Sequence, residues 1–173
     1  MVTSTDLPSE LQDIGENINY VRLIDQMNKP LGVTLFVGAG LSIPFGFPGW
    51  EKFLITQAEI AGIKDDIQRR IDKGEFEEAS ADLRDTLGVG DFNDSISAAY
   101  GPKEIDYRKR DESVSLLPQL CNGPVITTNF DNVLKDVFEQ AHRPFEKVVW
   151  GAKADSVRDS LYRSRRFLLK IHV

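Results

Sequence analysis

Three short stretches of this sequence contain residue types suited to binding and catalysis, and each one follows an apolar run. They are Gly38-Ala39-Gly40 with Ser42, Thr127-Thr128-Asn129-Phe130-Asp131, and His172. Glycines allow positive φ and let backbone N–H groups approach a phosphate closely. The second stretch places an amide and a carboxylate between a predicted strand and a predicted helix. A histidine has a pKa near neutral, which suits it to proton transfer.

Each stretch also has a purely structural interpretation. Gly38-Ala39-Gly40 can be a tight turn, because the third glycine of a G-x-G-x-x-G pattern would fall at Ile43 and no Gly-Lys-Ser/Thr ending follows. Asn129 or Thr128 can cap a helix, with Asp131 favouring its positive end. A single histidine after a strand is commonly structural. Taken one at a time, the stretches leave both interpretations open.

The elements that must position these residues alternate between strand and helix patterns. We predict strands at residues 33–37, 124–127, 147–150 and 167–171, the first of them buried, and helices at residues 9–27, 50–61, 116–121, 130–141 and 155–164. Residues 64–100 read as charged helices broken at glycines. The alternation predicts an α/β fold with a mainly parallel sheet. Ligands of such sheets bind at the carboxyl ends of the strands, where all three stretches fall.

Composition narrows the possible partners. The net charge of −6 argues against binding to nucleic acid or to an anionic membrane surface. Cys121 is the single cysteine, so the chain has no internal disulfide and no multi-cysteine metal site. No apolar run approaches the roughly 20 residues that span a bilayer, and the polar start does not resemble a signal peptide. We therefore expect a cytoplasmic protein.

The three stretches, in this order, resemble the catalytic core of the sirtuin superfamily. The likeness is closest to its zinc-less branch, the sirtuin-like NAD-cleaving domains of bacterial anti-phage defence proteins. GAGLSIPFGFPGW is similar to the first motif of that branch, TTNFDNVLKDVFE to the second, and KIH to the start of the third. Sirtuin deacylases carry four zinc-binding cysteines and a Pro-x-Phe-Arg type sequence, where this chain has Cys121 alone and Pro48-Gly49-Trp50-Glu51. These departures disfavour protein deacylation.

The resemblance implies a Rossmann-like sheet with helices on both faces and a helical insert or lid. We expect an N-terminal helix within residues 1–30 and the sirtuin-like domain in residues 31–173, with the insert at residues 51–112. In the family, the histidine that corresponds to His172 is followed by glycine and further strands. The domain is therefore expected to be incomplete after residue 173.

The implied activity is NAD glycohydrolysis, which yields nicotinamide and ADP-ribose, in the effector of an anti-phage defence system. By resemblance, Asn129 orients the ribose and the attacking water, and His172 acts as the base. The expected NAD-binding residues are Gly38, Ala39, Gly40, Ser42, Thr128 and Asp131. Phe45 and Phe47 are expected to pack in the core rather than cover the site. The alternative is a non-catalytic module of a larger assembly that binds NAD or ADP-ribose, or an interaction module. Besides NAD or ADP-ribose, the expected partner is a second copy of the chain or a partner protein of a defence complex.

No metal is expected to take part. Cys121, His142 and His172 cannot build a closed zinc site without carboxylates, and His142 is predicted to cap a helix C-terminus. Treatment with a chelator should leave both the melting temperature and the activity unchanged. Stoichiometric zinc in an elemental analysis of the purified protein would contradict this expectation.

Overall fold

Among the residues that the structure describes, four parallel strands form the sheet at the centre of the molecule. The structure, a computed structural model, describes residues 18–29, 32–105, 112–151, 154–163 and 166–171. Its strands are β1 (Leu35–Val37), β2 (Val125–Thr127), β3 (Lys147–Trp150) and β4 (Phe167–Lys170), in the order β1-β2-β4-β3. The last residue of each strand is paired with the last residue of its neighbour, so all four carboxyl ends share one edge. The predicted α/β class and parallel sheet are confirmed.

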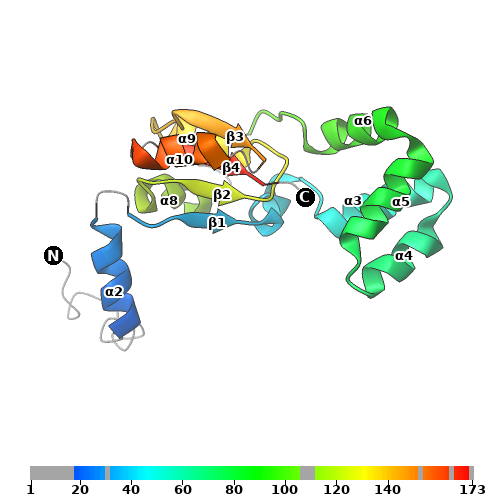
Figure 1. Cartoon of the computed structure of the whole chain (residues 1–173), viewed down its shortest axis with the longest axis horizontal. Helices are drawn as coiled ribbons and strands as arrows, with labels where there is room; N and C mark the ends of the chain where they lie inside the picture. Colours follow the sequence, from blue (N-terminus) through cyan, green and yellow to red (C-terminus); the bar gives the residue numbers. More distant parts are fainter. Residues whose placement is uncertain (1–17, 30–31, 106–111, 152–153, 164–165, 172–173) are drawn as a thin grey trace.

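Helices cover both faces of this sheet. They are α8 (Glu112–Leu120), α9 (Val133–Gln140) and α10 (Ala154–Tyr162). Connections between parallel strands are almost always right-handed. With this strand order, that rule places α8 and α9 together on one face and α10 on the other (Figure 1). Helix α9 is held there by apolar residues on one side, namely Val133, Leu134, Val137 and Phe138, all of them buried.

A layer of helices lies beyond the carboxyl ends of the strands (Figure 1). Its members are α3 (Trp50–Ala61), α4 (Lys64–Asp72), α5 (Phe76–Leu87) and α6 (Val89–Tyr100). The breaks between them fall at Gly62, Gly74 and Gly88, each with a positive φ that other residues rarely adopt. Helix α2 (Ile18–Met27) lies on the opposite side of the sheet from this helical layer.

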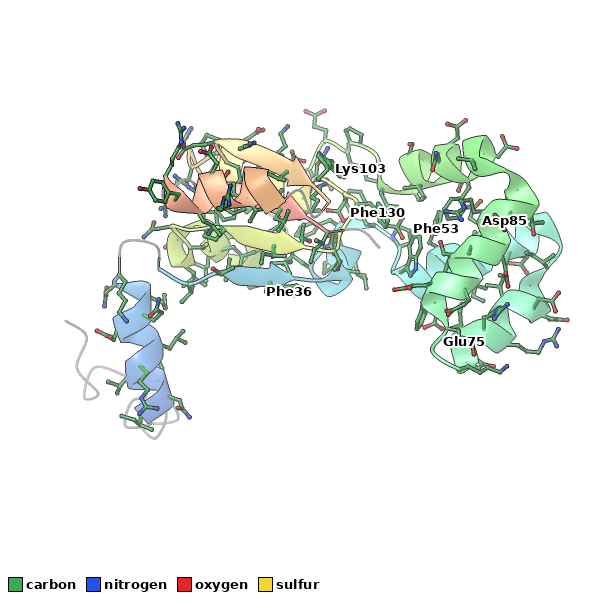
Figure 2. The ribbon with its side chains drawn as sticks, viewed as in Figure 1. Phe36, Phe53, Glu75, Asp85, Lys103 and Phe130 are labelled. Carbon is green, nitrogen blue, oxygen red and sulfur yellow. The ribbon has the colours of Figure 1, made fainter. Side chains whose placement is uncertain are left out.

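The burial of one strand and the starts of two helices were predicted wrongly. The first strand was predicted to be buried, but β1 lies at an edge of the sheet and Phe36 is 67% exposed (Figure 2). The helix predicted from residue 130 begins at Val133, because the Asp131 carboxylate accepts the Val133 N–H and forms a turn first. Helix α8 starts at Glu112, four residues earlier than predicted. Residues 9–17 of the predicted first helix lie outside the described residues.

Four aromatic rings join the helical layer to the sheet, and we call them the aromatic junction. Trp50 stacks on Phe53 and on Phe130, with centroid separations of 5.2 and 5.3 Å. The Tyr100 ring lies 5.5 Å from that of Phe53 and 5.4 Å from that of Phe130. Phe130 comes from the loop after β2, whereas the other three belong to α3 and α6. Figure 2 labels Phe53 and Phe130, one from each side. The contacts therefore set the position of the helical layer over the edge of the sheet.

The aromatic junction should contribute strongly to stability. Phe53 is 2% exposed, so Phe53→Ala is expected to lower the free energy of unfolding by about 3–5 kcal/mol. Ile60→Ala on the same helix is the matched control, because Ile60 is 72% exposed and its truncation should change that free energy by less than about 0.5 kcal/mol. Urea denaturation measures both variants, and equal losses would contradict the assignment.

Candidate functional site

A cavity of about 370 Å³ lies between the carboxyl edge of the sheet and helix α5. The sheet side of its wall comes from the turn after β1, the loop after β2 and the end of β4. The helical layer supplies the other side. Its lining residues are Ala39, Ser42, Pro48, Trp50, Phe76, Glu77, Ser80, Ala81, Arg84, Tyr100, Thr128, Asn129, Phe130, Asp131 and Ile171. The cavity thus occupies the position at which parallel α/β sheets bind their ligands.

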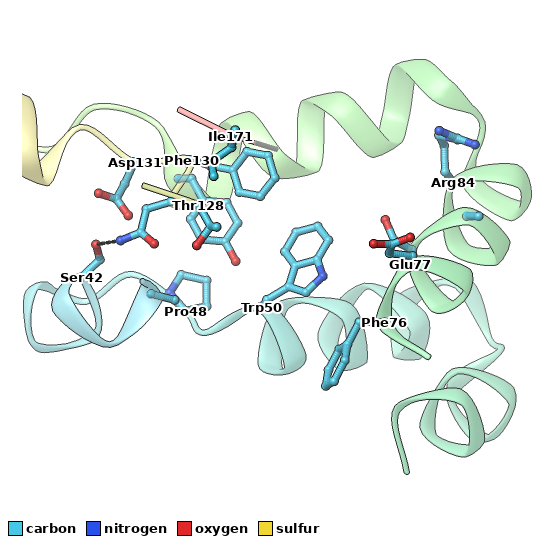
Figure 3. A pocket seen from close by; sticks show the side chains of 15 residues that line it. Ser42, Pro48, Trp50, Phe76, Glu77, Arg84, Thr128, Phe130, Asp131 and Ile171 are labelled. Atoms are coloured by element: carbon cyan, nitrogen blue, oxygen red, sulfur yellow. Dashed lines mark hydrogen bonds between the residues drawn. The ribbon is translucent and has the colours of Figure 1, made fainter. Parts of the chain in front are cut away.

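Asn129 connects the two turns on the sheet side. Its Nδ2 donates to the Gly38 carbonyl and to Ser42 Oγ, both at 3.0 Å. The bond to Ser42 is the dashed line in Figure 3. Its backbone N–H donates to Thr127 Oγ1 at 3.0 Å, and that hydroxyl donates to the Val37 carbonyl at 2.8 Å. Asn129 is 5% exposed, and its Oδ1 has no hydrogen-bond partner among the described residues. A buried acceptor without a partner is costly, so this atom marks a position for a donor from a ligand or a water.

The glycine-rich turn folds as two short 3₁₀ helices, η2 (Ala39–Leu41) and η3 (Ile43–Phe45). Neither Gly38 nor Gly40 has a positive φ, so the conformational freedom expected of them is not used here. A Cβ built on either one meets nothing within 4 Å, which leaves the space beside the backbone open. Ala39 and Ser42 line the cavity, whereas both glycines are exposed beside it.

Asp131 and Thr128 also reach the cavity, in different ways. Asp131 is 5% exposed, and its Oδ1 accepts the Val133 N–H at 2.9 Å at the start of α9. The local capping expected of Asn129 or Thr128 is therefore made by Asp131. Burial raises the pKa of Tyr100 to about 12, and the nearby Asp131 carboxylate adds to that shift. Thr128 is exposed at the mouth of the same wall.

Lys170 is a buried residue at this edge that the sequence analysis did not single out. It is 1% exposed at the end of β4, and its Nζ donates to the carbonyls of Phe130 at 2.9 Å and Asp131 at 2.5 Å. The same ammonium lies 4.6 Å from the centre of the Trp150 ring. Burial lowers the pKa of Lys170 to about 8. The sequence signal for this residue is a single lysine in the apolar run FLLKI. A lysine buried in such a strand is almost always paired, so its presence there predicts a partner for the ammonium.

The helical layer contributes lining residues that no motif indicated. In Figure 3, Ser42 and Asp131 lie toward one end of the cavity, Glu77 and Arg84 lie toward the other, and Trp50 stands between them. Helix α5 is charged on several sides, so its sequence does not reveal which side faces a ligand. The prediction of a helical insert indicated the segment but not these residues.

The remaining predicted residues divide into three outcomes. His172 lies outside the described residues. Phe45 and Phe47 are 3% and 4% exposed within the hydrophobic core, which confirms that they pack there. His142 follows α9 with φ at 57°, and its N–H donates to the Glu139 carbonyl while Arg143 N–H donates to the Phe138 carbonyl. This pattern is a Schellman motif, so the predicted C-terminal cap is confirmed.

Within the described ranges, no three His, Cys, Asp or Glu side chains gather as a metal site would require. Cys121 is buried, and burial raises the pKa of its thiol. None of the described helices combines the length and the apolar character needed to cross a bilayer.

In comparisons with known proteins, the sequence matches no protein-family model and no curated protein. The argument for function therefore rests on the motifs and on the geometry of the cavity.

The glycine-rich turn can be tested by filling the open space beside it. Gly40→Val should fold, because its Cβ meets no protein atom within 4 Å. If nucleotide phosphates approach this turn, the branched side chain should weaken NAD binding at least about tenfold. Calorimetry compares it with Gly90→Val on α6, where an added Cβ also meets nothing and affinity should be unchanged. Equal affinities in two folded variants would refute phosphate binding at the turn.

Proposed function

We propose that the cavity binds NAD and that this chain is an NAD glycohydrolase domain, the effector of an anti-phage defence system. The observation that carries the proposal is the side chain of Asn129. It ties the glycine-rich turn to the loop after β2 and keeps an unpartnered Oδ1 at the wall of the cavity. The order of motifs supports the same function, because the glycine-rich turn and the Asn-x-Asp loop of the sirtuin-like pattern line one cavity.

The proposed reaction is NAD plus water giving nicotinamide, ADP-ribose and a proton. The bond between the ribose anomeric carbon and the pyridinium nitrogen breaks, and its electron pair stays with the nitrogen. Nicotinamide leaves as a neutral ring, so the leaving group needs no general acid. Positive charge develops on the sugar as the bond breaks, and the water oxygen then bonds to the anomeric carbon. The proton from that water passes to a base.

Each proposed role follows from where the residue lies. The turn at residues 38–42 would receive the pyrophosphate, with Ala39 and Ser42 at the cavity wall. Asn129 Oδ1 would accept a hydrogen bond from a ribose hydroxyl or from the attacking water. Asp131 would favour the positive charge that develops on the sugar and contact the ribose or the carboxamide. His172 would be the base, a role that rests on its place in the sequence after β4.

The open cavity also suits the alternative, a module that binds NAD or ADP-ribose without cleaving it. Both functions require the protein to bind NAD, but only the glycohydrolase would release nicotinamide from it. A protein that binds NAD by calorimetry and releases no nicotinamide over hours would favour the alternative.

Cleavage is best tested by following nicotinamide release in the full-length protein. Asn129→Ala and His172→Ala should each reduce turnover by roughly two to four orders of magnitude, the scale of general-base and electrostatic contributions. The affinity for NAD should fall less than turnover, because the proposed pyrophosphate contacts lie at the turn of residues 38–42. The loss of affinity should be the larger of the two in Asn129→Ala, which also removes the bonds from Asn129 Nδ2 to Gly38 and Ser42 of that turn. Asn93→Ala, at an exposed position on α6, is the matched control.

Chromatography of the reaction mixture separates nicotinamide from NAD and gives the rates directly. Unchanged release in both Asn129→Ala and His172→Ala would show that the site is wrongly assigned. A wild-type protein that neither binds nor cleaves NAD would refute the function itself.

A further inference from the structure

Tyr100 holds a second unpartnered polar atom at the same cavity. The residue is 7% exposed, and its hydroxyl has no hydrogen-bond partner among the described residues. A buried tyrosine hydroxyl normally finds a partner, because leaving it without one costs free energy. The cavity that the ring lines offers the space in which a ligand could supply that partner.

The structure holds this hydroxyl in a fixed place. The ring of Tyr100 contacts Phe53 of α3 and Phe130 of the loop after β2, at 5.5 and 5.4 Å between centroids. Tyr100 is the last residue of α6. Its side chain is therefore constrained by rings from both the helical layer and the loop after β2.

The hydroxyl belongs to the end of the cavity that contains Asn129 and Asp131. Its ring is packed on Phe130, which stands between those two residues in the sequence. The Asp131 carboxylate is close enough to add to the raised pKa of Tyr100, whose first cause is burial. A phenol with a pKa of about 12 stays protonated at physiological pH, so it can donate a hydrogen bond.

We propose that Tyr100 is a substrate-binding residue, whose hydroxyl donates a hydrogen bond to the carboxamide oxygen of the nicotinamide ring. This inference rests on the proposed function and adds a specificity residue from the helical layer. The wall beside the hydroxyl suits a planar ring, because Trp50 and Phe130 line it. The Asn129 and Asp131 end is also where the proposed reaction breaks the bond to nicotinamide. The helical layer would thus contact nicotinamide, the part of NAD that leaves in the reaction.

The test measures the binding of nicotinamide and of ADP-ribose, the two products of the proposed reaction, separately. Tyr100→Phe keeps the ring and its contacts and removes the hydroxyl alone. In wild type and variant, NMR titration gives dissociation constants for nicotinamide and for ADP-ribose, neither of which the enzyme consumes. We expect nicotinamide to bind roughly three- to tenfold more weakly to the variant, the value of one hydrogen bond. ADP-ribose should bind within about twofold of wild type, since it lacks the carboxamide.

Two controls keep the result specific. Tyr162→Phe removes a hydroxyl from a tyrosine that is 90% exposed on α10, and it should change neither constant. The melting temperature of ligand-free Tyr100→Phe should not fall, because no internal hydrogen bond is lost. A fall of several degrees would show that the hydroxyl is bonded within the protein and would overturn the inference.

The remaining outcomes distinguish this inference from the function on which it rests. Unchanged nicotinamide affinity in Tyr100→Phe, or equal losses for nicotinamide and ADP-ribose, would overturn the role of Tyr100 alone. A wild-type protein that binds neither ligand would overturn the proposed function and the role of Tyr100 with it.

Discussion

The candidate site depends on a chain of hydrogen bonds across the carboxyl edge of the sheet. The Thr127 hydroxyl donates to Val37 and accepts from the backbone of Asn129, whose side chain donates to Gly38 and Ser42. The bonds to Val37, Gly38 and Ser42 join segments about 90 residues apart in the sequence, and the side chains of Ser42, Thr127 and Asn129 are buried. Because the parallel register aligns Val37 with Thr127, the two turns meet in one geometry. Asn129 can then use its amide nitrogen for the fold and leave its oxygen for a ligand.

Lys170, at the end of β4, completes this edge of the sheet. An ammonium group is expensive to bury, and its cost here is offset by two carbonyls and the face of Trp150. Both carbonyls belong to the loop that contains Asn129 and Asp131. The lysine therefore holds that loop against β4, and the lowered pKa reflects its removal from water. Such a group fixes the geometry of a site without touching a ligand itself.

The sequence predicted the parts of the fold that follow from local patterns. Apolar runs and helical spacing identified the four strands and their parallel arrangement, and they located the described helices to within a few residues. The predicted strand ends also placed Asn129 and Asp131 at one edge of the sheet. The start of α9 was predicted three residues too early, because the Asp131 carboxylate accepts a hydrogen bond from the Val133 N–H and so forms a turn in place of the first helical turn. The exposure of Phe36 was missed because a short apolar run predicts a strand without showing whether that strand lies at the edge or in the centre of the sheet. Tyr100 and Glu77 could not be predicted as cavity residues, since their position depends on how the helical layer packs.

That packing gives the two sides of the cavity different physical characters. The sheet side is fixed by hydrogen bonds between backbone and short polar side chains, which tolerate little displacement. The helical side meets it through stacked rings of the aromatic junction, whose contacts are less directional. Residues of the edge are thus suited to chemistry, which needs fixed geometry, and the aromatic residues of the helical layer are suited to contacts with a planar part of a ligand across the cavity.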